Sequence, residues 1–185
     1  MTFKYLNFFE KTAEIFINPE KTLKSVKEKN EAKKGVYFLI FYSAFLGLIF
    51  GTVLGGAIGN PLLVLVFAIF AIICALIKIF IWTLITHIVS KVFFDGEGEL
   101  GRFFGLMGYS AAPYILLIIG ITSIAFGKAI IASLIMFLLA LIWIIFIGII
   151  ATESEQKIGY GKSFLSCMGI PSLLVIIVFF IMGVL

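Results

Sequence analysis

The segment PLLVLVFAIFAIICALI, residues 61–77, decides the fold class, because it continues for 17 residues without one charged side chain. With its flanks it reaches the roughly 20 apolar residues that a helix needs to cross about 30 Å of hydrocarbon. Similar runs recur along the chain of 185 residues, which is 62% hydrophobic and 13% charged, with a mean hydropathy of +1.21. Too few polar residues remain to cover a soluble globule of this size. The sequence therefore predicts an integral, multi-pass membrane protein.

Apolar runs separated by polar breaks predict an all-α polytopic bundle of five transmembrane helices. The expected spans are residues 36–57, 62–90, 103–126, 129–151 and 164–185, with limits good to a few residues. Residues 1–35 are predicted to form a separate helical arm, and residues 36–185 the membrane domain.

The arm is predicted to contain two helices. Apolar residues at helical spacing suit the first helix to the membrane interface, and they are Tyr5, Leu6, Phe9, Ala13, Phe16 and Ile17. Asn18 is expected to cap a second helix that begins at Pro19. The lysine-rich second helix is either a solvated flank or a segment attracted to anionic lipid headgroups.

The distribution of charges predicts the orientation in the membrane. If the amino terminus is cytosolic, 12 of the 14 basic residues fall in the arm and in the two inner loops. Lys128 lies in an outer turn, and Lys78 lies within the second span. All 10 carboxylates fall on the inner side as well. The positive-inside rule then places the amino terminus in the cytosol and the carboxyl terminus outside, with a cytosolic working face.

Two stripes of small residues are predicted to be helix-packing surfaces, because helices in lipid associate by close backbone approach. The first stripe consists of Ser43, Gly47, Gly51, Gly55 and Gly59. The second stripe consists of Gly101, Gly105, Gly108 and Ala112, within about 60° on a helix. The first stripe joins spans within one molecule or joins two copies in a homo-oligomer, and at the second stripe another helix can approach closely.

Pro113 and Lys78 interrupt the apolar spans. Pro113 removes a backbone donor, so we expect a kink that exposes a carbonyl near Tyr109 and Ser110. Lys78 lies 17 residues past Pro61, roughly 25 Å along the helix. Its ammonium either reaches the inner headgroups or faces inward in a functional role.

The loop DGEGE, residues 95–99, offers carboxylates at alternate positions, but an EF-hand would need an acid at the place of Leu106. A solvated interaction loop formed by Asp95, Glu97, Glu99 and Arg102 is the interpretation that we prefer to a metal site. The single histidine, His87, and the absence of GxSxG argue against a metal centre or a serine hydrolase. We therefore expect no catalytic residue, no metal and no cofactor. Cys74 and Cys167 are expected to be buried packing residues.

Four stretches carry a family resemblance. They are INPEKTLKSV (17–26), FFDGEGELGRFFGLMGYSAAPYI (93–115), LALIWIIFIGI (139–149) and ESEQKIGYGKSF (153–164). Their arrangement resembles the Ypt-interacting-protein (Yip) domain family, small five-span membrane proteins with a cytosolic amino terminus. The resemblance covers nearly the whole chain, and its most specific part is the cluster of Gly108, Tyr109 and Pro113.

The resemblance implies a non-enzymatic membrane scaffold or adaptor. Eukaryotic relatives are associated with vesicle trafficking and with binding prenylated Rab-type GTPases. The chain lacks their long amino-terminal region and their acidic-Leu-Tyr-Gly-Pro motif, so GTPase binding is not carried over. The expected partners are the bilayer, anionic headgroups and a membrane or cytosolic protein, without nucleic acid. The expected location is the cell membrane in a prokaryote or an endomembrane in a eukaryote. The alternative function is a small transporter or channel subunit that uses Lys78 and the Pro113 kink.

Overall fold

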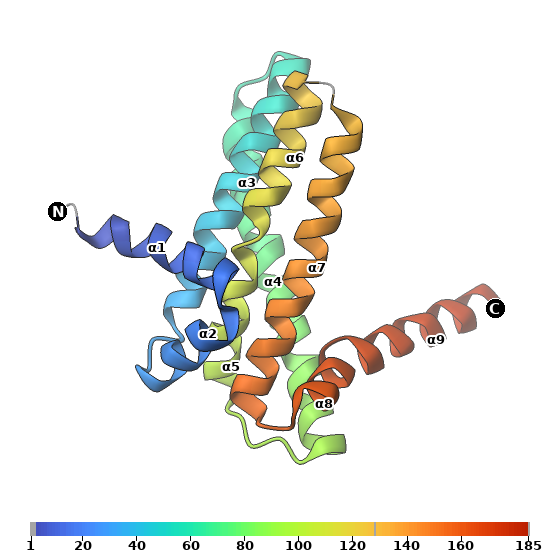
Figure 1. Ribbon diagram of the computed structural model, residues 1–185. Helices are drawn as coiled ribbons and strands as arrows, with labels where there is room; N and C mark the ends of the chain where they lie inside the picture. Colours follow the sequence, from blue (N-terminus) through green and yellow to red (C-terminus); the bar gives the residue numbers. More distant parts are fainter. Residues whose placement is uncertain (1–2, 128, 185) are drawn as a thin grey trace.

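The computed structural model describes residues 3–127 and 129–184, and all regular secondary structure in these ranges is helical. The helices are α1 (Phe3–Ile17), α2 (Pro19–Glu28), α3 (Lys34–Ile58), α4 (Leu62–Phe94), α5 (Leu100–Gly108), α6 (Tyr114–Gly127), α7 (Ile130–Gln156), α8 (Tyr160–Phe164) and α9 (Ile170–Val184). The long helices α3, α4 and α7 and the α5–α6 segment stand side by side as a bundle (Figure 1). The prediction of an all-α fold is confirmed for the described residues.

Helices α3 and α4 form a tightly packed hairpin, because glycines on α3 let the two backbones meet. A Cβ atom on Gly47 would lie 2.5 Å from the Phe67 carbonyl oxygen, and one on Gly51 would lie 2.7 Å from the Val64 Cα atom. Gly55 makes a similar approach to Asn60 at the turn. Gly59 ends α3 with a φ of 73°, a left-handed conformation that glycine adopts without strain. This stripe therefore packs within one molecule.

The third span is interrupted at Pro113, between α5 and α6. A single 3-10 turn, Tyr109–Ala111, replaces the α-helical turn there. Proline cannot donate to the carbonyl of Tyr109, four residues earlier, and that carbonyl instead accepts from the Ala112 amide at 3.0 Å. The exposed carbonyl that we expected is thus satisfied by a local tightening of the chain.

The arm folds onto the bundle. Asn18 caps α2 by accepting a hydrogen bond from the Lys21 amide, and Pro19 occupies the first turn, as predicted. Helix α1 contacts the bundle through Phe8, whose ring stacks on Phe38 at 4.2 Å, and through Thr12, whose hydroxyl is 2.8 Å from that of Tyr42. Of the apolar positions predicted for the membrane interface, Phe9, Ala13 and Ile17 lie on the exposed face, and Phe16 packs against the core.

The last apolar segment differs from the expected single span over residues 164–185. A π-helical turn, Leu165–Gly169, joins α8 to α9, and α9 leaves the bundle at a steep angle (Figure 1). Pro171 cannot donate to the carbonyl of Cys167, which accepts from the Trp82 indole at 2.9 Å instead. Among the described residues, four segments have the length and hydropathy of a membrane span, and they end at Gln156. The fifth crossing stays a prediction.

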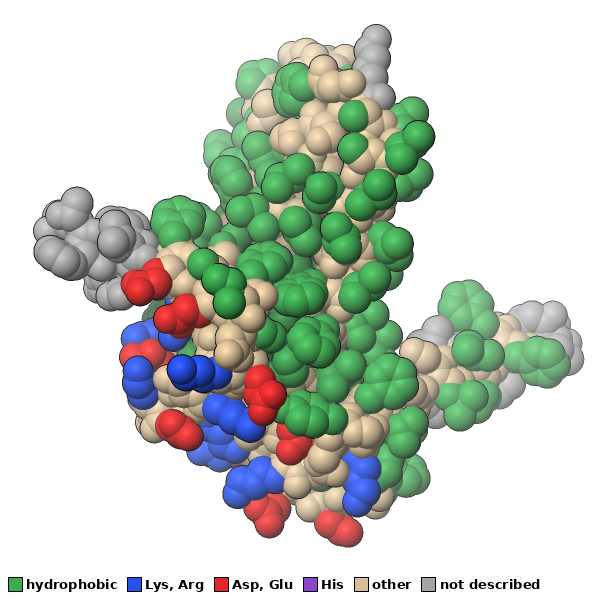
Figure 2. Space-filling view, viewed as in Figure 1, with side chains coloured by type: hydrophobic (Ala, Val, Ile, Leu, Met, Phe, Trp, Pro, Cys, Tyr) green, Lys and Arg blue, Asp and Glu red, His purple; other side chains and the backbone are tan. Residues whose placement is uncertain are grey.

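The charged side chains gather at one end of the bundle, around α2 and α8, whereas apolar side chains cover the visible shaft (Figure 2). Helix α4 has 33 residues, so at about 1.5 Å per residue it is roughly 50 Å long and exceeds the hydrocarbon thickness. Cys167 is buried as predicted, but Cys74 is exposed on the apolar surface of α4, so the prediction for Cys74 was wrong. Lys128 lies outside the described residues.

Candidate interaction site at the charged end of the bundle

The acidic loop, residues 95–99, is fixed to the end of α7 by its own backbone. The Gly98 amide donates to the Gln156 side-chain oxygen at 3.1 Å, and the Glu97 amide donates to the Gln156 carbonyl at 3.2 Å. The Glu99 amide donates to the Glu155 carboxylate at 2.9 Å. Three consecutive amides thus find partners on α7, so the loop has a defined conformation.

The two loop glycines permit this close approach. A Cβ atom on Gly96 would lie 2.6 Å from the Gln156 side-chain oxygen, and one on Gly98 would lie 2.7 Å from the Gln156 side-chain carbon. Asp95 begins the loop in a left-handed conformation, with a φ of 55°, which aspartate tolerates better than most residues. In DGEGE, the glycines therefore let the backbone lie against α7, while the side chains of the alternating acidic residues lie at the surface.

Glu155 is the buried charge at the centre of this contact. Its carboxylate is inaccessible, and both oxygens lie 2.9 Å from the Arg102 Nε atom. The Lys27 ammonium is 3.4 Å from the carboxylate and also donates to the Ser154 carbonyl. Two cations and one backbone amide compensate the loss of hydration, which an isolated buried carboxylate could not sustain.

Gln156 is also fully buried and extends the contact to α4. Because its side-chain oxygen accepts from Gly98, its amide nitrogen faces His87 and donates to the Nδ1 atom at 2.9 Å. The only histidine therefore helps to hold the loop. We call the group of Lys27, His87, Arg102, Glu155 and Gln156 the Glu155 clasp.

The Glu155 clasp leaves the loop carboxylates at the surface. Asp95, Glu97 and Glu99 are all exposed, and Glu97 makes only an exposed ion pair with Lys157, at 3.3 Å. Arg102, grouped with these acids from the sequence, points instead to Glu155 and is 3.9 Å from Glu99. Within residues 3–127 and 129–184, no cluster of three metal-ligating side chains is present.

The second glycine stripe makes contact over only part of its predicted length. Gly105 lies against Ala32, where a Cβ atom would be 2.4 Å from the carbonyl oxygen, and Gly108 lies equally close to the Gly35 carbonyl. A Cβ atom on Gly101 would have no neighbour within 4 Å. The stripe thus joins α5 to the start of α3, and Gly101 is not part of the contact.

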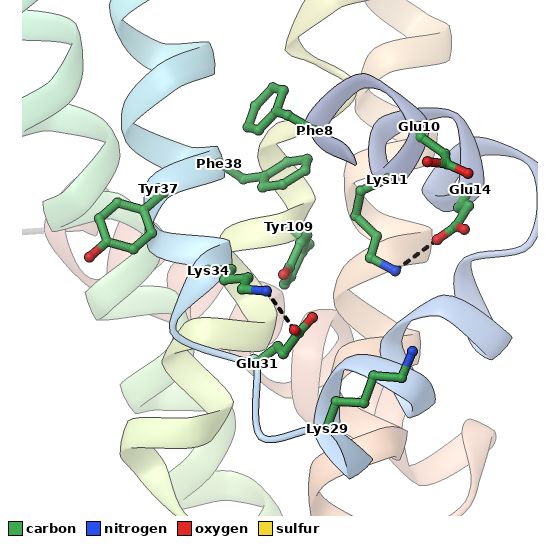
Figure 3. Close-up of a pocket in the computed structure, with 10 residues that line it drawn as sticks. All are labelled: Phe8, Glu10, Lys11, Glu14, Lys29, Glu31, Lys34, Tyr37, Phe38 and Tyr109. Carbon is green, nitrogen blue, oxygen red and sulfur yellow. Dashed lines mark hydrogen bonds and ion pairs between the residues drawn. The ribbon is translucent and has the colours of Figure 1, made fainter. Parts of the chain in front are cut away.

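That contact positions Tyr109 beside a cavity of about 690 Å³, which we call the arm cavity (Figure 3). The cavity lies between α1, the 29–34 connection and the first turn of α3. Its lining residues are Phe8, Glu10, Lys11, Glu14, Lys29, Glu31, Lys34, Tyr37, Phe38 and Tyr109. A hydrogen bond from Lys34 lowers the pKa of Glu31 below its ordinary value, so the Glu31 carboxylate is charged at neutral pH. The cavity combines aromatic surface with charges of both signs.

Lys78 and the Pro113 kink meet in the structure. The Lys78 ammonium donates to the Tyr114 hydroxyl at 2.6 Å and lies 5.0 Å from the centre of that ring. Tyr114 is the first residue of α6, directly after Pro113. The phenol therefore supplies a neutral partner for a charge on the apolar face of α4.

The sequence did not reveal Glu155 and Gln156. We ended the fourth span at Ala151, but α7 continues to Gln156 and carries both side chains into the interior. In the sequence, a glutamate that directly follows an apolar run is the only sign of such a residue. Glu153, two residues earlier, shows the same sign but is more exposed than Glu155 in the structure.

Comparison with known proteins identifies one family. The model of the Yip1 domain matches residues 13–182 and therefore spans α2 to α8 completely. No significant match was found among curated proteins or among solved structures.

Proposed function

The chain belongs to the Yip1 domain family. On that premise, we propose that it is a non-enzymatic membrane scaffold. We propose that its charged end recruits a cytosolic or membrane protein that has a basic surface. The observation that carries the proposal is the acidic loop. Its backbone is anchored to α7 while its three carboxylates remain exposed. A fixed array of charges loses little conformational freedom on binding, and complementary charge favours association and selectivity.

The proposal requires the charged end to face the cytosol. A cysteine at Glu97, in a variant without Cys74 and Cys167, should be shielded from an impermeant thiol reagent in intact cells. A cysteine at Asn60, in the turn at the opposite end of the bundle, should react. Labelling at Glu97 without permeabilisation would contradict the orientation and remove the basis for a cytosolic partner.

Recruitment is tested by replacing Asp95, Glu97 and Glu99 together by Ser. Partners captured by crosslinking in native membranes and identified by mass spectrometry should be lost from this variant, and recovery from the parent should fall at high salt. A control variant with Glu14, Glu20 and Glu28 replaced by Ser removes the same charge from the arm. Equal loss from both variants would show that only net charge matters, and unchanged recovery would overturn the proposal.

The contact between Lys78 and Tyr114 supports a second candidate function, a small transporter or channel subunit. Under this alternative, Lys78 and Tyr114 would form a polar site along the solute pathway, beside the Pro113 kink. Replacing Lys78 by Met should then abolish solute flux in proteoliposomes, while Lys91→Met at the charged end should not. Binding of partners through the acidic loop does not depend on Lys78, so the two functions are separable.

A further inference from the structure

The arm cavity lies at the level where the chain enters the first span. Lys34, the first residue of α3, forms part of its wall, as do Tyr37 and Phe38 on the next turn. Helix α1 closes the opposite side (Figure 3). At about 690 Å³, the cavity has the size of a small-molecule site, and it adjoins the expected headgroup region.

The charges that line the arm cavity are balanced, with three lysines and three glutamates. Four of these side chains form two ion pairs, Lys11 with Glu14 at 2.7 Å and Lys34 with Glu31. The other two, Lys29 and Glu10, make no ion pair within the described parts of the chain. The cavity therefore offers one cation and one anion to a ligand.

Tyr109 is the polar group that points to a bound molecule. The residue is buried as a whole and lines the arm cavity, but its hydroxyl oxygen stays accessible and makes no hydrogen bond among the residues that the structure describes. An accessible phenol hydroxyl without a partner in the protein is free to donate a hydrogen bond to a ligand in the cavity. Tyr42, in the same aromatic cluster, is bonded to Thr12.

The aromatic wall adds a surface for a cation and for the apolar part of a ligand. Phe8 stacks on Phe38 at 4.2 Å, and Phe38 lies 4.9 Å from Tyr109. Ring faces attract ammonium groups and also accept glycerol and acyl carbons. Lys29 reaches toward the cavity from the side opposite α1 (Figure 3).

We propose that the arm cavity binds the headgroup of a phospholipid with a primary ammonium, of the phosphatidylethanolamine type. The phosphate is held by the Lys29 ammonium and the Tyr109 hydroxyl, and the ligand ammonium is held by the Glu10 carboxylate. The balanced lining favours a zwitterion, because an anionic headgroup would leave Glu10 opposed to its charge. The site is independent of the acidic loop, so its loss and the loss of partner recruitment are separate results.

Binding is measured by native mass spectrometry of the full chain in detergent, with three probes: dioleoyl phosphatidylethanolamine, dioleoyl phosphatidylglycerol and soluble glycerophosphoethanolamine. We expect the ethanolamine lipid to bind at least about tenfold more tightly than either other probe. Lys29→Ser, Glu10→Gln and Tyr109→Phe should each weaken it by about tenfold, the effect of one charge-assisted hydrogen bond.

Two variants serve as controls for the charge changes. Lys21→Ser and Glu28→Gln alter exposed residues that do not line the arm cavity and should leave binding unchanged. Equal affinity for the glycerol lipid would overturn recognition of the ammonium, and equal affinity for the soluble headgroup would overturn the assignment to lipid. Unchanged binding by the three cavity variants would overturn the site itself.

Discussion

The Glu155 clasp and the arm cavity both contain charged and hydrogen-bonding side chains, but only those of the Glu155 clasp all have partners within the described chain. In the Glu155 clasp, the buried carboxylate and the buried amide of α7 both have partners within the chain. In the arm cavity, the accessible hydroxyl of Tyr109 has none among the described residues, and the exposed Lys29 and Glu10 have no ion pair there. Burial demands compensation only in the Glu155 clasp, which is therefore complete by itself, whereas the arm cavity keeps polar groups free for a ligand.

The largest effect is expected where α5 meets the connection before α3. In Gly105→Leu, the first side-chain carbon already collides with the Ala32 backbone, which cannot yield as a side chain would. Overpacking costs about 1–3 kcal/mol and more against backbone, so we expect poor assembly, low yield and a reduced Tm in detergent. Gly101→Leu, on the same face but in open space, should behave like the parent. Equal behaviour of the two variants would refute the packing of Gly105.

The second effect concerns the buried charge. Glu155→Leu removes the carboxylate that accepts from Arg102 and from the Glu99 amide and that pairs with Lys27, which keeps its backbone acceptors. Breaking a buried pair costs about 3–5 kcal/mol. Since Arg102 and Lys27 are partly exposed, we expect on the order of 3 kcal/mol, measured by denaturant unfolding in detergent. Glu153→Leu removes one hydrogen bond from the buried Ser163 hydroxyl and should cost about 1 kcal/mol, less than Glu155→Leu. A neutral Glu155→Leu would show that the Glu155 clasp is not a structural element.

The variants at Gly105 and Gly101 and those at Glu155 and Glu153 also show which features could be predicted from the sequence. The hydrophobic runs predicted four of the spans, and glycine spacing predicted the face of α3 that meets α4, since both follow from helical periodicity. Gly101 lies on the same helix face as Gly105 but does not contact the Ala32 backbone. Helical periodicity predicts which face of a helix makes a contact, but it does not predict how far along the helix the contact extends. Glu153 and Glu155 both lie in the last turn of α7 and differ in the face that they occupy. That α7 continues past Ala151 to bury Glu155 depends on tertiary partners, which local sequence does not reveal.

The last segment shows the same limit. Its apolar residues predicted a span, but the π-helical turn and Pro171 bend the chain before α9. The acceptor that Pro171 leaves open, the Cys167 carbonyl, is bonded by Trp82 from a distant helix. A partner at that distance along the chain has no signature in the local sequence. The family resemblance indicates the cluster of Gly108, Tyr109 and Pro113, yet only the structure shows that Tyr109 lines the arm cavity.

A smaller effect is expected in the acidic loop. Gly98→Ala places a methyl group 2.7 Å from the Gln156 side-chain carbon, so the loop or the amide must shift. We expect a loss of about 1–2 kcal/mol, together with faster hydrogen exchange at the amides of residues 97–99. Gly161→Ala, in open space in α8, is the control. If exchange at the loop does not change, the loop is not held by Gln156.

The smallest effect, and the one that separates the two regions most directly, is that of Tyr109→Phe. The substitution removes an accessible, unbonded hydroxyl and keeps the ring against Phe38, so in lipid-free detergent the free energy of unfolding should change by less than about 0.5 kcal/mol. Tyr42→Phe removes a hydroxyl that is bonded to Thr12 at 2.8 Å and should cost about 1 kcal/mol under the same conditions. When phosphatidylethanolamine is added, the parent and Tyr42→Phe should gain stability, because a ligand that binds the native state stabilises it in proportion to its occupancy. Tyr109→Phe should gain less. A destabilised lipid-free Tyr109→Phe would mean that the chain itself satisfies this hydroxyl, and the arm cavity would then be complete in the same way as the Glu155 clasp.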